Sequence, residues 1–362
     1  MPNHPFAHAL PAAPFVAVVG ATGAVGAELL RCLAVRRFPL AGLRLLASPR
    51  SAGRSLPFGD RELVVEPLSE PAFDGIDLAL FSAGSDVSRR YAPVAVRAGA
   101  VVVDNSSAFR KDPEVPLVVP EVNAATLAGH RGIVANPNCV AAIASVALAP
   151  LHRAHRIRRI AAATYQAASG AGAAAMEELR QSTAAYLQGE AFLPRILPHP
   201  YAFNLFSHDA AIDPYSGYNG EELKVVAELR RLLDRPDLPI GVTCVRVPVL
   251  RAHAIALTVT FDEPVDPVEV RRQLAAAPGL RLADDRPGNR FPMPSEATGQ
   301  DDVLVGRVRS DLGDPSGCSI ALFVAGDQLL KGAALNAVQI AERLLDRSAA
   351  APEARQRVPE RA

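Results

Sequence analysis

The sequence predicts an α/β protein with two domains, and three observations carry this expectation. Short apolar runs alternate with helical stretches through the first 140 or so residues. A glycine-rich segment directly follows the first apolar run. Beyond this region, longer β-branched runs and two separate helical stretches replace the alternation. We therefore expect an N-terminal Rossmann-like, doubly wound parallel sheet, followed by an α+β domain with a mixed sheet.

The elements of the first half follow from apolar spacing. Phe15–Val19 ends at Gly20 and fits a buried parallel strand, and Ala24–Phe38 has the apolar period of a helix. Further runs of this kind predict four more strands, at Leu43–Ala47, Leu78–Phe81, Ala100–Val103 and Gly132–Ala135.

The second half has different elements. Expected here are helices at Ala141–Ala149, Ala173–Tyr186 and Gly220–Leu233, and β-branched strands at Ile160–Thr164 and Val242–Thr260. Pro194–Pro214 is Pro-rich and predicts an irregular surface excursion, and Asp327–Leu345 predicts a long helix that returns to the first domain. The expected domains are residues 14–140 with 327–346, and residues 141–326, with flexible termini at 1–13 and 348–362.

Composition excludes several classes of protein. The chain of 362 residues carries 38 Lys and Arg against 38 Asp and Glu, whereas nucleic-acid and membrane-surface proteins have a basic excess. No apolar run approaches the roughly 20 residues that cross a bilayer, and the first residues lack the apolar core of a signal peptide. Four scattered cysteines indicate a reducing compartment and no zinc site. We expect a soluble, cytoplasmic protein that acts on a small molecule.

The segment Gly20-Ala21-Thr22-Gly23-Ala24-Val25-Gly26 follows a predicted strand and opens a predicted helix. Glycines at this spacing let the backbone approach a pyrophosphate, and the helix N-terminus supplies free N–H groups. The spacing is G-x-x-G-x-x-G, a variant of the usual fingerprint. The segment predicts nucleotide binding, and the alternative is a tight turn that binds nothing.

The end of the second predicted strand favours NADP over NAD. An NAD-preferring fold places a carboxylate near this point to bond the ribose 2′-OH. Here the residues are Ser48, Arg50, Ser51 and Arg54 instead. Hydroxyl and guanidinium groups suit a 2′-phosphate, although ordinary solvated loop residues are the alternative.

Cys139 is the candidate nucleophile. It follows Asn136-Pro137-Asn138 at a predicted strand-to-helix junction, where α/β folds place ligands. A helix N-terminus lowers the pKa of a thiol and makes the thiolate available. The alternative is a buried structural cysteine.

Four short segments add polar candidates. Gln166, Ser169 and Gly170 lie where a strand runs into a glycine-rich turn, which suits an oxyanion donor and a close cofactor approach. Glu221 and Lys224 share a helix face, as either a solvated ion pair or a grip on ammonium and phosphate. The remaining two segments contribute Arg246 with His253, and Arg110.

Arg246 is the one charge in an apolar strand and therefore needs an anion, from a substrate or from the protein. His253 is a candidate general acid or base, although a lone strand histidine is more often structural. Their spacing of seven would put them on opposite faces of a flat strand, so Pro248 predicts a break between them. Arg110 follows a strand and is either a phosphate clamp or a surface residue.

Taken together, these motifs resemble the aspartate-β-semialdehyde dehydrogenase family. The matching pieces keep the family's order from residue 15 to about 345: Gly20–Gly26, Ala47–Gly53, Asp104–Arg110, Asn136–Cys139, Thr164–Gly172, Tyr218–Lys224, Thr243–Val249 with His253, Asn289–Pro292, Gln300–Gly306 and Gly326–Glu342.

The resemblance implies a role for each site residue. Cys139 would form an acyl-enzyme thioester, His253 would act as general acid/base, and Gln166 would position the substrate. The implied substrate contacts are Arg246 to the α-carboxylate, Glu221 to the ammonium, and Arg110 with Lys224 to the phosphate. The implied NADP contacts are Thr22 to Val25, Arg50, Ser51, Ser169, Gly170 and Gln328. No metal is implied, and the second domain would bind substrate and form a homodimer or a dimer of dimers.

The implied reaction is NADPH-dependent reduction of L-aspartyl-4-phosphate to L-aspartate-4-semialdehyde, on the route to lysine, threonine, methionine and diaminopimelate. This chain departs from the family in having Val140 and Ala141 where small hydroxyl residues are usual, and Gln328 near Lys331 where Asn is expected. The rivals are a related acyl-phosphate or acyl-thioester reductase, such as N-acetyl-γ-glutamyl-phosphate reductase or malonyl-CoA reductase, and a catalytically silent NADP-binding copy.

Overall fold

The computed structural model describes residues 10–350 and divides the chain into two units. The first unit contains the chain up to Pro137 and again from Ala334, and the second contains Asn138–Ala333. The sequence prediction put the return to the first unit at residue 327, whereas this division puts it at Ala334.

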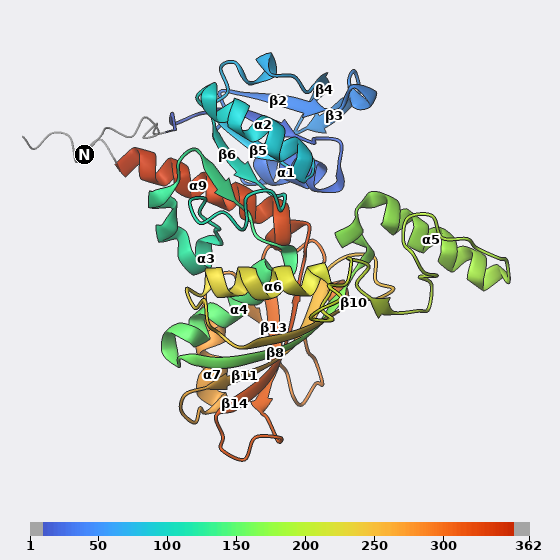
Figure 1. Ribbon diagram of the computed structural model, residues 1–362, viewed down its shortest axis with the longest axis vertical. Helices are drawn as coiled ribbons and strands as arrows, with labels where there is room; N and C mark the ends of the chain where they lie inside the picture. Colours follow the sequence, from blue (N-terminus) through green and yellow to red (C-terminus); the bar gives the residue numbers. More distant parts are fainter. Residues whose placement is uncertain (1–9, 351–362) are drawn as a thin grey trace, which may run out of the picture. The chain divides into compact units, whose positions relative to one another are not determined.

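A doubly wound sheet forms the first unit, as predicted (Figure 1). Its strand order is β3-β4-β2-β1-β5-β6-β7, and all neighbours are parallel except β3 and β4. The reversal of order on either side of β1 is the feature that places ligand sites at the carboxyl edge of such sheets. The strands are β1 Phe15–Val19, β2 Gly42–Ala47, β3 Ser55–Phe58, β4 Arg61–Pro67, β5 Leu78–Phe81, β6 Val101–Asp104 and β7 Ile133–Ala135.

The central strands of this sheet read as continuous apolar runs because helices cover both faces. Every residue of β5 and β6 is buried, and Val16–Val19 of β1 has no exposed surface. The sequence prediction did not include the hairpin of β3 and β4, whose residues are mostly exposed. The helices of this unit are α1 Ala24–Val35, α2 Ser85–Arg97, α3 Pro120–Asn123 and α9 Leu335–Ala350.

A mixed sheet forms the second unit, as predicted. Its order is β12-β13-β14-β11-β8-β10-β9, in which β8 pairs with β10 in parallel and with β11 antiparallel. The strands are β8 Ile157–Gln166, β9 Phe206–Ser207, β10 Ile240–Arg246, β11 His253–Phe261, β12 Leu280–Leu282, β13 Val303–Ser310 and β14 Ser319–Gly326.

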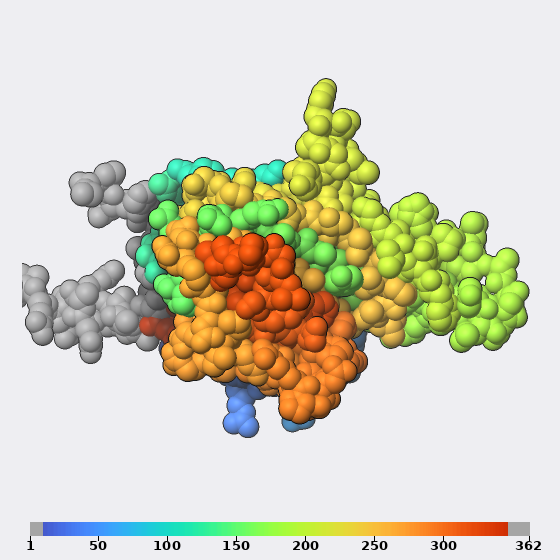
Figure 2. All heavy atoms as spheres, turned by 90° about the horizontal axis from the view of Figure 1, so that it is seen from below, coloured from blue at the N-terminus to red at the C-terminus, as the bar shows by residue number. Residues whose placement is uncertain are grey.

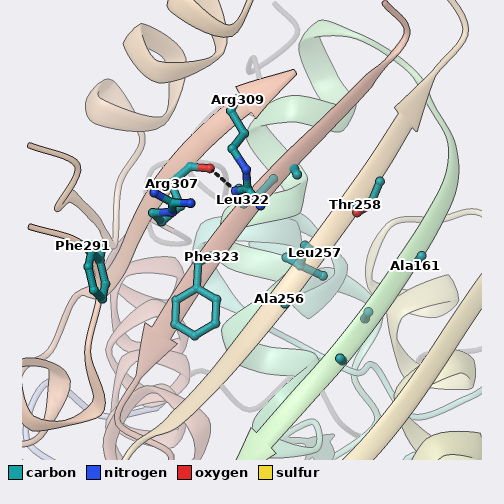
Figure 3. Close-up of a pocket in the computed structure, with 12 residues that line it drawn as sticks. Ala161, Ala256, Leu257, Thr258, Phe291, Arg307, Arg309, Leu322 and Phe323 are labelled. Carbon is teal, nitrogen blue, oxygen red and sulfur yellow. Dashed lines mark hydrogen bonds between the residues drawn. The ribbon is translucent and has the colours of Figure 1, made fainter. Parts of the chain in front are cut away.

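Helices α4 Cys139–Ala154, α6 Gly220–Leu232 and α7 Pro267–Ala276 pack against strands of this sheet. The face that Ala256, Thr258 and Phe323 share carries instead an apolar trough of about 690 Å³. Figure 3 shows Phe323, Phe291, Arg307 and Arg309 among the residues that line this trough. The remaining helices of the unit are α5 Ala173–Gln188 and α8 Pro294–Ala297.

The expected break between Arg246 and His253 is present, and one predicted helix needs correction. Val242–Thr260 contains parts of two strands, because β10 ends at Arg246 and a connection with Ala252 at φ 72° separates it from β11. Asp327–Leu345 is not one α-helix: Asp327 accepts from the N–H of Leu329 in a turn, a π-helix spans Leu330–Ala334, and only then does α9 begin.

The predicted flexible tail began at residue 348, but α9 extends to Ala350. The rest of that tail, and residues 1–9 of the predicted N-terminal arm, lie outside the described residues.

The predicted excursion at Pro194–Pro214 follows α5 and is mostly irregular, with the short strand β9 inside it. Figure 2 shows this part of the second unit, in green and yellow-green, extending outward from the rest of the unit. The buried carboxylate of Glu178 on α5 accepts from the backbone N–H groups of Arg195, Ile196 and Leu197, at 2.6, 2.7 and 2.9 Å. The excursion is therefore tied to α5 by a charged acceptor. Among residues 10–350, no helix is long and apolar enough to cross a membrane.

Candidate active site

Cys139 is the first residue of α4, so the predicted helix N-terminus is confirmed. The side chain of Asn138 caps this helix by accepting from the N–H groups of Val140 and Ala141, at 2.9 and 3.3 Å. Cys139 is partly exposed, whereas Cys32, Cys244 and Cys318 are buried. The thiol therefore lies at the positive end of a capped helix, where an incoming group can reach it.

Helix α6 holds the cap residue from two positions. Glu221 Oε1 accepts from Nδ2 of Asn138 at 2.8 Å, and a Glu228 carboxylate oxygen accepts from the backbone N–H of Asn138 at 2.5 Å. These glutamates are seven residues apart and so lie on one face of the helix. The sequence did not suggest Glu228, because its burial is not visible in the sequence, where it reads as one more exposed glutamate of a helix.

Gly332, in the π-helix, leaves the room that Cys139 occupies. A Cβ at Gly332 would lie 2.8 Å from the Cβ of Cys139 and 3.2 Å from its Cα, closer than side chains tolerate. π-Helical turns often occur at functional sites. The position of the nucleophile therefore depends on a glycine that lies in the matching piece Gly326–Glu342 but was given no role from the sequence.

Gln166, Glu221 and Lys224 lie close together, and Glu221 and Lys224 share a face of α6 as predicted. Nε2 of Gln166 donates to Glu221 Oε1 at 3.2 Å, and Lys224 Nζ is 3.6 Å from Glu221 Oε2. Burial opposes ionisation of Glu221, but the charge of His208, the amide of Asn138 and Lys224 together hold the pKa of this carboxyl below its usual value. Glu221 is therefore an ionised centre with several donors around it.

His253 is completely buried, and its Nδ1 accepts from the backbone N–H of Ala167 at 3.0 Å. Burial first, and then the charge of Arg246, lower the pKa of His253 to about 3. The ring is thus neutral at physiological pH and, with Nδ1 accepting, carries its proton on Nε2. Among the described residues, this Nε2 is one of the few buried polar side-chain atoms with no hydrogen-bond partner.

Arg246 and His253 reach the same space from different strands, which resolves their odd spacing. A Cβ at Gly170 would lie 3.1 Å from Nη1 of Arg246 and 3.1 Å from Nε2 of His253. The absence of a side chain at Gly170 therefore leaves open the space that these two donors face. Arg246 has the anionic partner that its burial requires, and this partner is a protein carboxylate, Asp209, at 3.0 Å.

Two of the predicted cofactor residues also present unpaired buried atoms. Within the described part of the chain, Ser169 Oγ and Gln328 Nε2 have no hydrogen-bond partner. Gln328 Oε1 accepts from the N–H of Ala252 at 3.0 Å, which fixes the side-chain amide and directs its amino group elsewhere. Buried polar atoms without a protein partner are rare, so these two atoms are candidates for contact with a ligand.

The glycine loop of the first unit has the geometry of a nucleotide cradle. Gly20 has φ 86°, and a Cβ there would lie 2.6 Å from the carbonyl oxygen of Ser82. A Cβ at Gly26 would lie 2.3 Å from the carbonyl oxygen of Gly20. Both positions therefore require glycine, and α1 begins directly at Ala24. Gly23, Ala24 and Val25 lie at the turn into this helix, as the sequence led us to expect.

Next to this loop, Thr22 Oγ1 lies 3.5 Å from Ser51 Oγ. Ser51 belongs to a 3-10 turn, Pro49–Ser51, that follows the end of β2, and Ser48 and Arg50 are exposed beside it. Hydroxyl and guanidinium groups therefore gather at the carboxyl edge of β1 and β2, where α/β folds bind the adenosine ribose.

Arg110 is held by backbone carbonyls of the first unit. Its Nε donates to Asn136 O at 2.8 Å, and its Nη2 donates to Asn105 O at 2.6 Å. Asn136 is held in turn, since its Oδ1 accepts from Asn336 of α9 at 2.6 Å. The predicted segments Asp104–Arg110 and Asn136–Cys139 are thus joined by a network that includes Asn336, a residue of the matching piece Gly326–Glu342 to which the sequence assigned no role.

The predicted site residues fall into two sets, one in each unit. The second unit contains nine of them: Cys139, Gln166, Ser169, Gly170, Glu221, Lys224, Arg246, His253 and Gln328. The glycine loop, Ser48, Arg50, Ser51 and Arg110 belong to the first unit. In residues 10–350, no cluster of three or more His, Cys, Asp or Glu side chains is arranged to hold a metal ion.

Two family models match the chain. One, described as the NAD binding domain of semialdehyde dehydrogenases, matches residues 15–130. The other, described as the dimerisation domain of semialdehyde dehydrogenases, matches residues 148–331. Together they cover most of both units.

Curated relatives and solved structures agree with these models. An aspartate-semialdehyde dehydrogenase of Synechocystis is 54% identical over 333 residues, covering 92% of this chain and 97% of the relative. One of Bacillus subtilis is 45% identical over 339 residues, covering 91% and 96%. The crystal structure of aspartate semialdehyde dehydrogenase II from Vibrio cholerae, complexed with ASA, has a TM-score of 0.89 at 42% identity, covering 92% of this chain and 98% of that one.

Proposed function

Because this chain belongs to the aspartate-semialdehyde dehydrogenase family, we propose that it reduces L-aspartyl-4-phosphate to L-aspartate-4-semialdehyde with NADPH and releases phosphate. The observation that carries this proposal is the placement of Cys139 at the start of α4 in the same unit as Gln166, Arg246 and His253. The related enzyme solved with ASA supports the choice of substrate. The product is a precursor of lysine, threonine, methionine and diaminopimelate, and we place the enzyme in the cytoplasm.

The thiolate of Cys139 attacks the acyl carbon of the aspartyl phosphate, phosphate leaves, and a thioester forms. When bound, NADPH supplies the hydride that reduces this thioester. The resulting thiohemiacetal on Cys139 then collapses to the aldehyde and restores the thiolate. In the reverse, phosphorylating direction the same steps run backward, and the reaction can then be followed as NADP reduction.

His253 acts at Nε2 in this scheme. Because its Nδ1 accepts from Ala167, the neutral ring presents an N–H toward the space left by Gly170. That N–H donates to the oxygen on the reacting carbon as negative charge develops there. The side-chain amide of Gln166 orients the substrate beside it.

Four charged residues bind the substrate. Arg246 binds the α-carboxylate, since its guanidinium faces the same space as His253. Glu221, which is ionised, receives the α-ammonium, and Lys224, half-exposed beside it, binds phosphate together with Arg110. The exposed position of Lys224 leaves its ammonium accessible to a phosphate oxygen.

The residues present fit NADP. The glycine loop from Gly20 to Gly26 would hold the pyrophosphate, and Ser48, Arg50 and Ser51 would bind the ribose 2′-phosphate. Ser169, Gly170 and Gln328 would contact the nicotinamide half, and the orphaned donors Ser169 Oγ and Gln328 Nε2 are the support for this assignment.

The test is phosphate-dependent NADP reduction with L-aspartate-4-semialdehyde, for the wild type and Cys139→Ser in parallel. We expect turnover that requires phosphate in the wild type and a loss of at least about 1000-fold in the variant. The same assay is repeated with an N-acetylated aldehyde in competition with L-aspartate-4-semialdehyde. Preference for the N-acetylated compound would identify an N-acetyl-γ-glutamyl-phosphate reductase. Absence of turnover while NADP still binds would identify a catalytically silent copy.

We further propose that two copies associate through the second unit, whose match is described as a dimerisation domain. The apolar trough over β8, β11 and β14, lined by Ala161, Ala256, Thr258 and Phe323, supports this sheet face as the interface (Figure 3). Ala256→Arg should then shift the mass in solution, measured by light scattering, to that of a monomer. Val35→Arg, at an exposed position of α1 in the first unit, should leave the mass unchanged. The wild-type mass distinguishes a homodimer from a dimer of dimers.

A further inference from the structure

Asp209 is the carboxylate partner of Arg246, and no sequence motif pointed to it. It lies in the excursion after α5, two residues beyond the short strand β9. In the antiparallel pairing of β9 with β10, Phe206 lies opposite Arg246, so the excursion passes beside this arginine. Asp209 Oδ1 accepts from Arg246 Nε at 3.0 Å.

This contact determines which edge of the guanidinium stays available. Nε is taken by Asp209, while Nη1 makes only a long contact of 3.4 Å with the carbonyl oxygen of Ala167. Nη1 also borders the space at Gly170 that His253 Nε2 faces. A guanidinium binds a carboxylate well only when the correct pair of N–H groups is presented to it.

The charges of Arg246 and Asp209 also offset each other. The Arg246 side chain is only 5% exposed, and an unpaired buried guanidinium would be costly. Burial opposes ionisation of Asp209, but the charge and hydrogen bond of Arg246 hold the pKa of this carboxyl below its usual value. Asp209 is thus ionised, and its charge offsets that of the buried Arg246.

We propose that Asp209 is a positioning residue for substrate selection: by holding the Nε edge of Arg246, it presents the Nη edge to the α-carboxylate of the incoming aldehyde or acyl phosphate. The selected class is therefore amino-acid-derived substrates with a free carboxylate. This inference rests on the proposed function, which assigns that carboxylate to Arg246.

The test is steady-state kinetics in the phosphorylating direction for Asp209→Ala and Asp209→Asn. Asp209→Ala should raise KM for L-aspartate-4-semialdehyde about tenfold and leave kcat within about threefold, because carboxylate binding is equal in ground and transition states. Asp209→Asn keeps an acceptor oxygen for Nε, so its KM should stay within about twofold of wild type. The KM for phosphate should not change in either variant.

A double-mutant cycle with Arg246→Ala separates positioning from general support of the loop. Asp209→Ala should raise KM no further in the Arg246→Ala background. The matched control is Asp213→Ala, an exposed carboxylate of the same excursion that bonds to Ser216 and should leave KM unchanged. The proposal is overturned if Asp209→Ala acts equally in both backgrounds, or if Asp209→Asn is as damaging as Asp209→Ala.

A second readout is independent of the substrate assignment. If the wild type does not turn over this aldehyde, the proposed function fails by itself, and positioning is then measured by alkylation of Cys139. The ratio of rates with anionic iodoacetate and neutral iodoacetamide should change in Asp209→Ala but not in Asp213→Ala. Equal ratios for wild type and Asp209→Ala, or an equal change in the Arg246→Ala background, would refute the coupling.

Discussion

Ala167 donates its backbone N–H to Nδ1 of His253 at 3.0 Å, and this single contact fixes which ring nitrogen carries the proton. Since burial keeps the ring neutral, Nε2 must be the N–H. The sequence left the roles of acid and base equally open for His253. The contact favours the donor role, because a base at Nε2 would first have to exchange tautomers against the Ala167 bond.

Replacing His253 should reduce the rate rather than substrate binding. We expect His253→Ala to lower kcat by roughly 100- to 10,000-fold with a small change in KM, because the Nε2–H hydrogen bond strengthens as negative charge develops in the transition state. His253→Gln keeps an N–H donor and should lose less. Steady-state kinetics of both variants provide the comparison, and equal losses would argue against the donor role.

His253 should also make the protein sensitive to acid. Its pKa falls from 6.5 to about 3 on folding, so between these values the unfolded chain binds more protons than the folded one. The free energy of unfolding should therefore decrease as pH falls through this window, by up to about 1.4 kcal/mol per pH unit from this residue. The free energy of unfolding of His253→Gln, measured with urea from pH 4.5 to 8, should change less steeply with pH than that of wild type below pH 6.5. Above pH 6.5 the dependence on pH should be unchanged. His199→Gln, at an exposed histidine, is the control and should keep the wild-type slope.

Gly332→Ala should displace the nucleophile. The added Cβ would meet the Cβ of Cys139 at 2.8 Å, so α4 or the π-helix must shift. We expect kcat, and the rate of Cys139 alkylation by iodoacetamide, to change at least about tenfold, since displacements of about 1 Å at a reacting group are costly. Gly241→Ala is the matched control, because a Cβ there has no atom within 4 Å. If Gly332→Ala keeps the wild-type kcat and alkylation rate, the residues around Cys139 accommodate the added methyl group without displacing the thiol.

Glu178 should stabilise the excursion after α5. It accepts three backbone N–H groups, and Glu178→Gln should weaken these bonds by roughly 1.5–3 kcal/mol in total by removing the charge. Hydrogen exchange at Arg195, Ile196 and Leu197 should then become faster. The neighbouring Glu177→Gln changes an exposed glutamate paired with Arg180, so exchange at these amides should stay as in wild type.

Arg50 should contribute to the preference for NADP. Arg50→Ala should raise KM for NADP about tenfold or more while changing KM for NAD little, because only NADP carries the 2′-phosphate. The control is Arg61→Ala, which removes an arginine of the exposed β3–β4 hairpin and should change neither the KM for NADP nor the KM for NAD. An equal rise for both cofactors in Arg50→Ala would mean that Arg50 contacts their common part.

Apolar period determined much of the fold from the sequence alone. β5 lies at the predicted residues, and α1, α5 and α6 begin where they were expected, because each buries one stripe or run of apolar side chains. The exposed hairpin of β3 and β4 was not predictable in this way, since its side chains face water. The break at Asp327 was missed for a related reason, because apolar spacing continues through the turn and the π-helix.

The site divides along the same line. The sequence determined the residues that have a local signal: Cys139 after its Asn-Pro-Asn turn, the glycine loop, and the single charge of Arg246 in an apolar strand. Only the tertiary structure decided their partners. Asp209, Glu228 and Gly332 reach the site from segments 37, 90 and 193 residues away from Arg246, Asn138 and Cys139, respectively. Charge pairing and close packing act through space, so such partners have no fixed spacing for a sequence pattern to reveal.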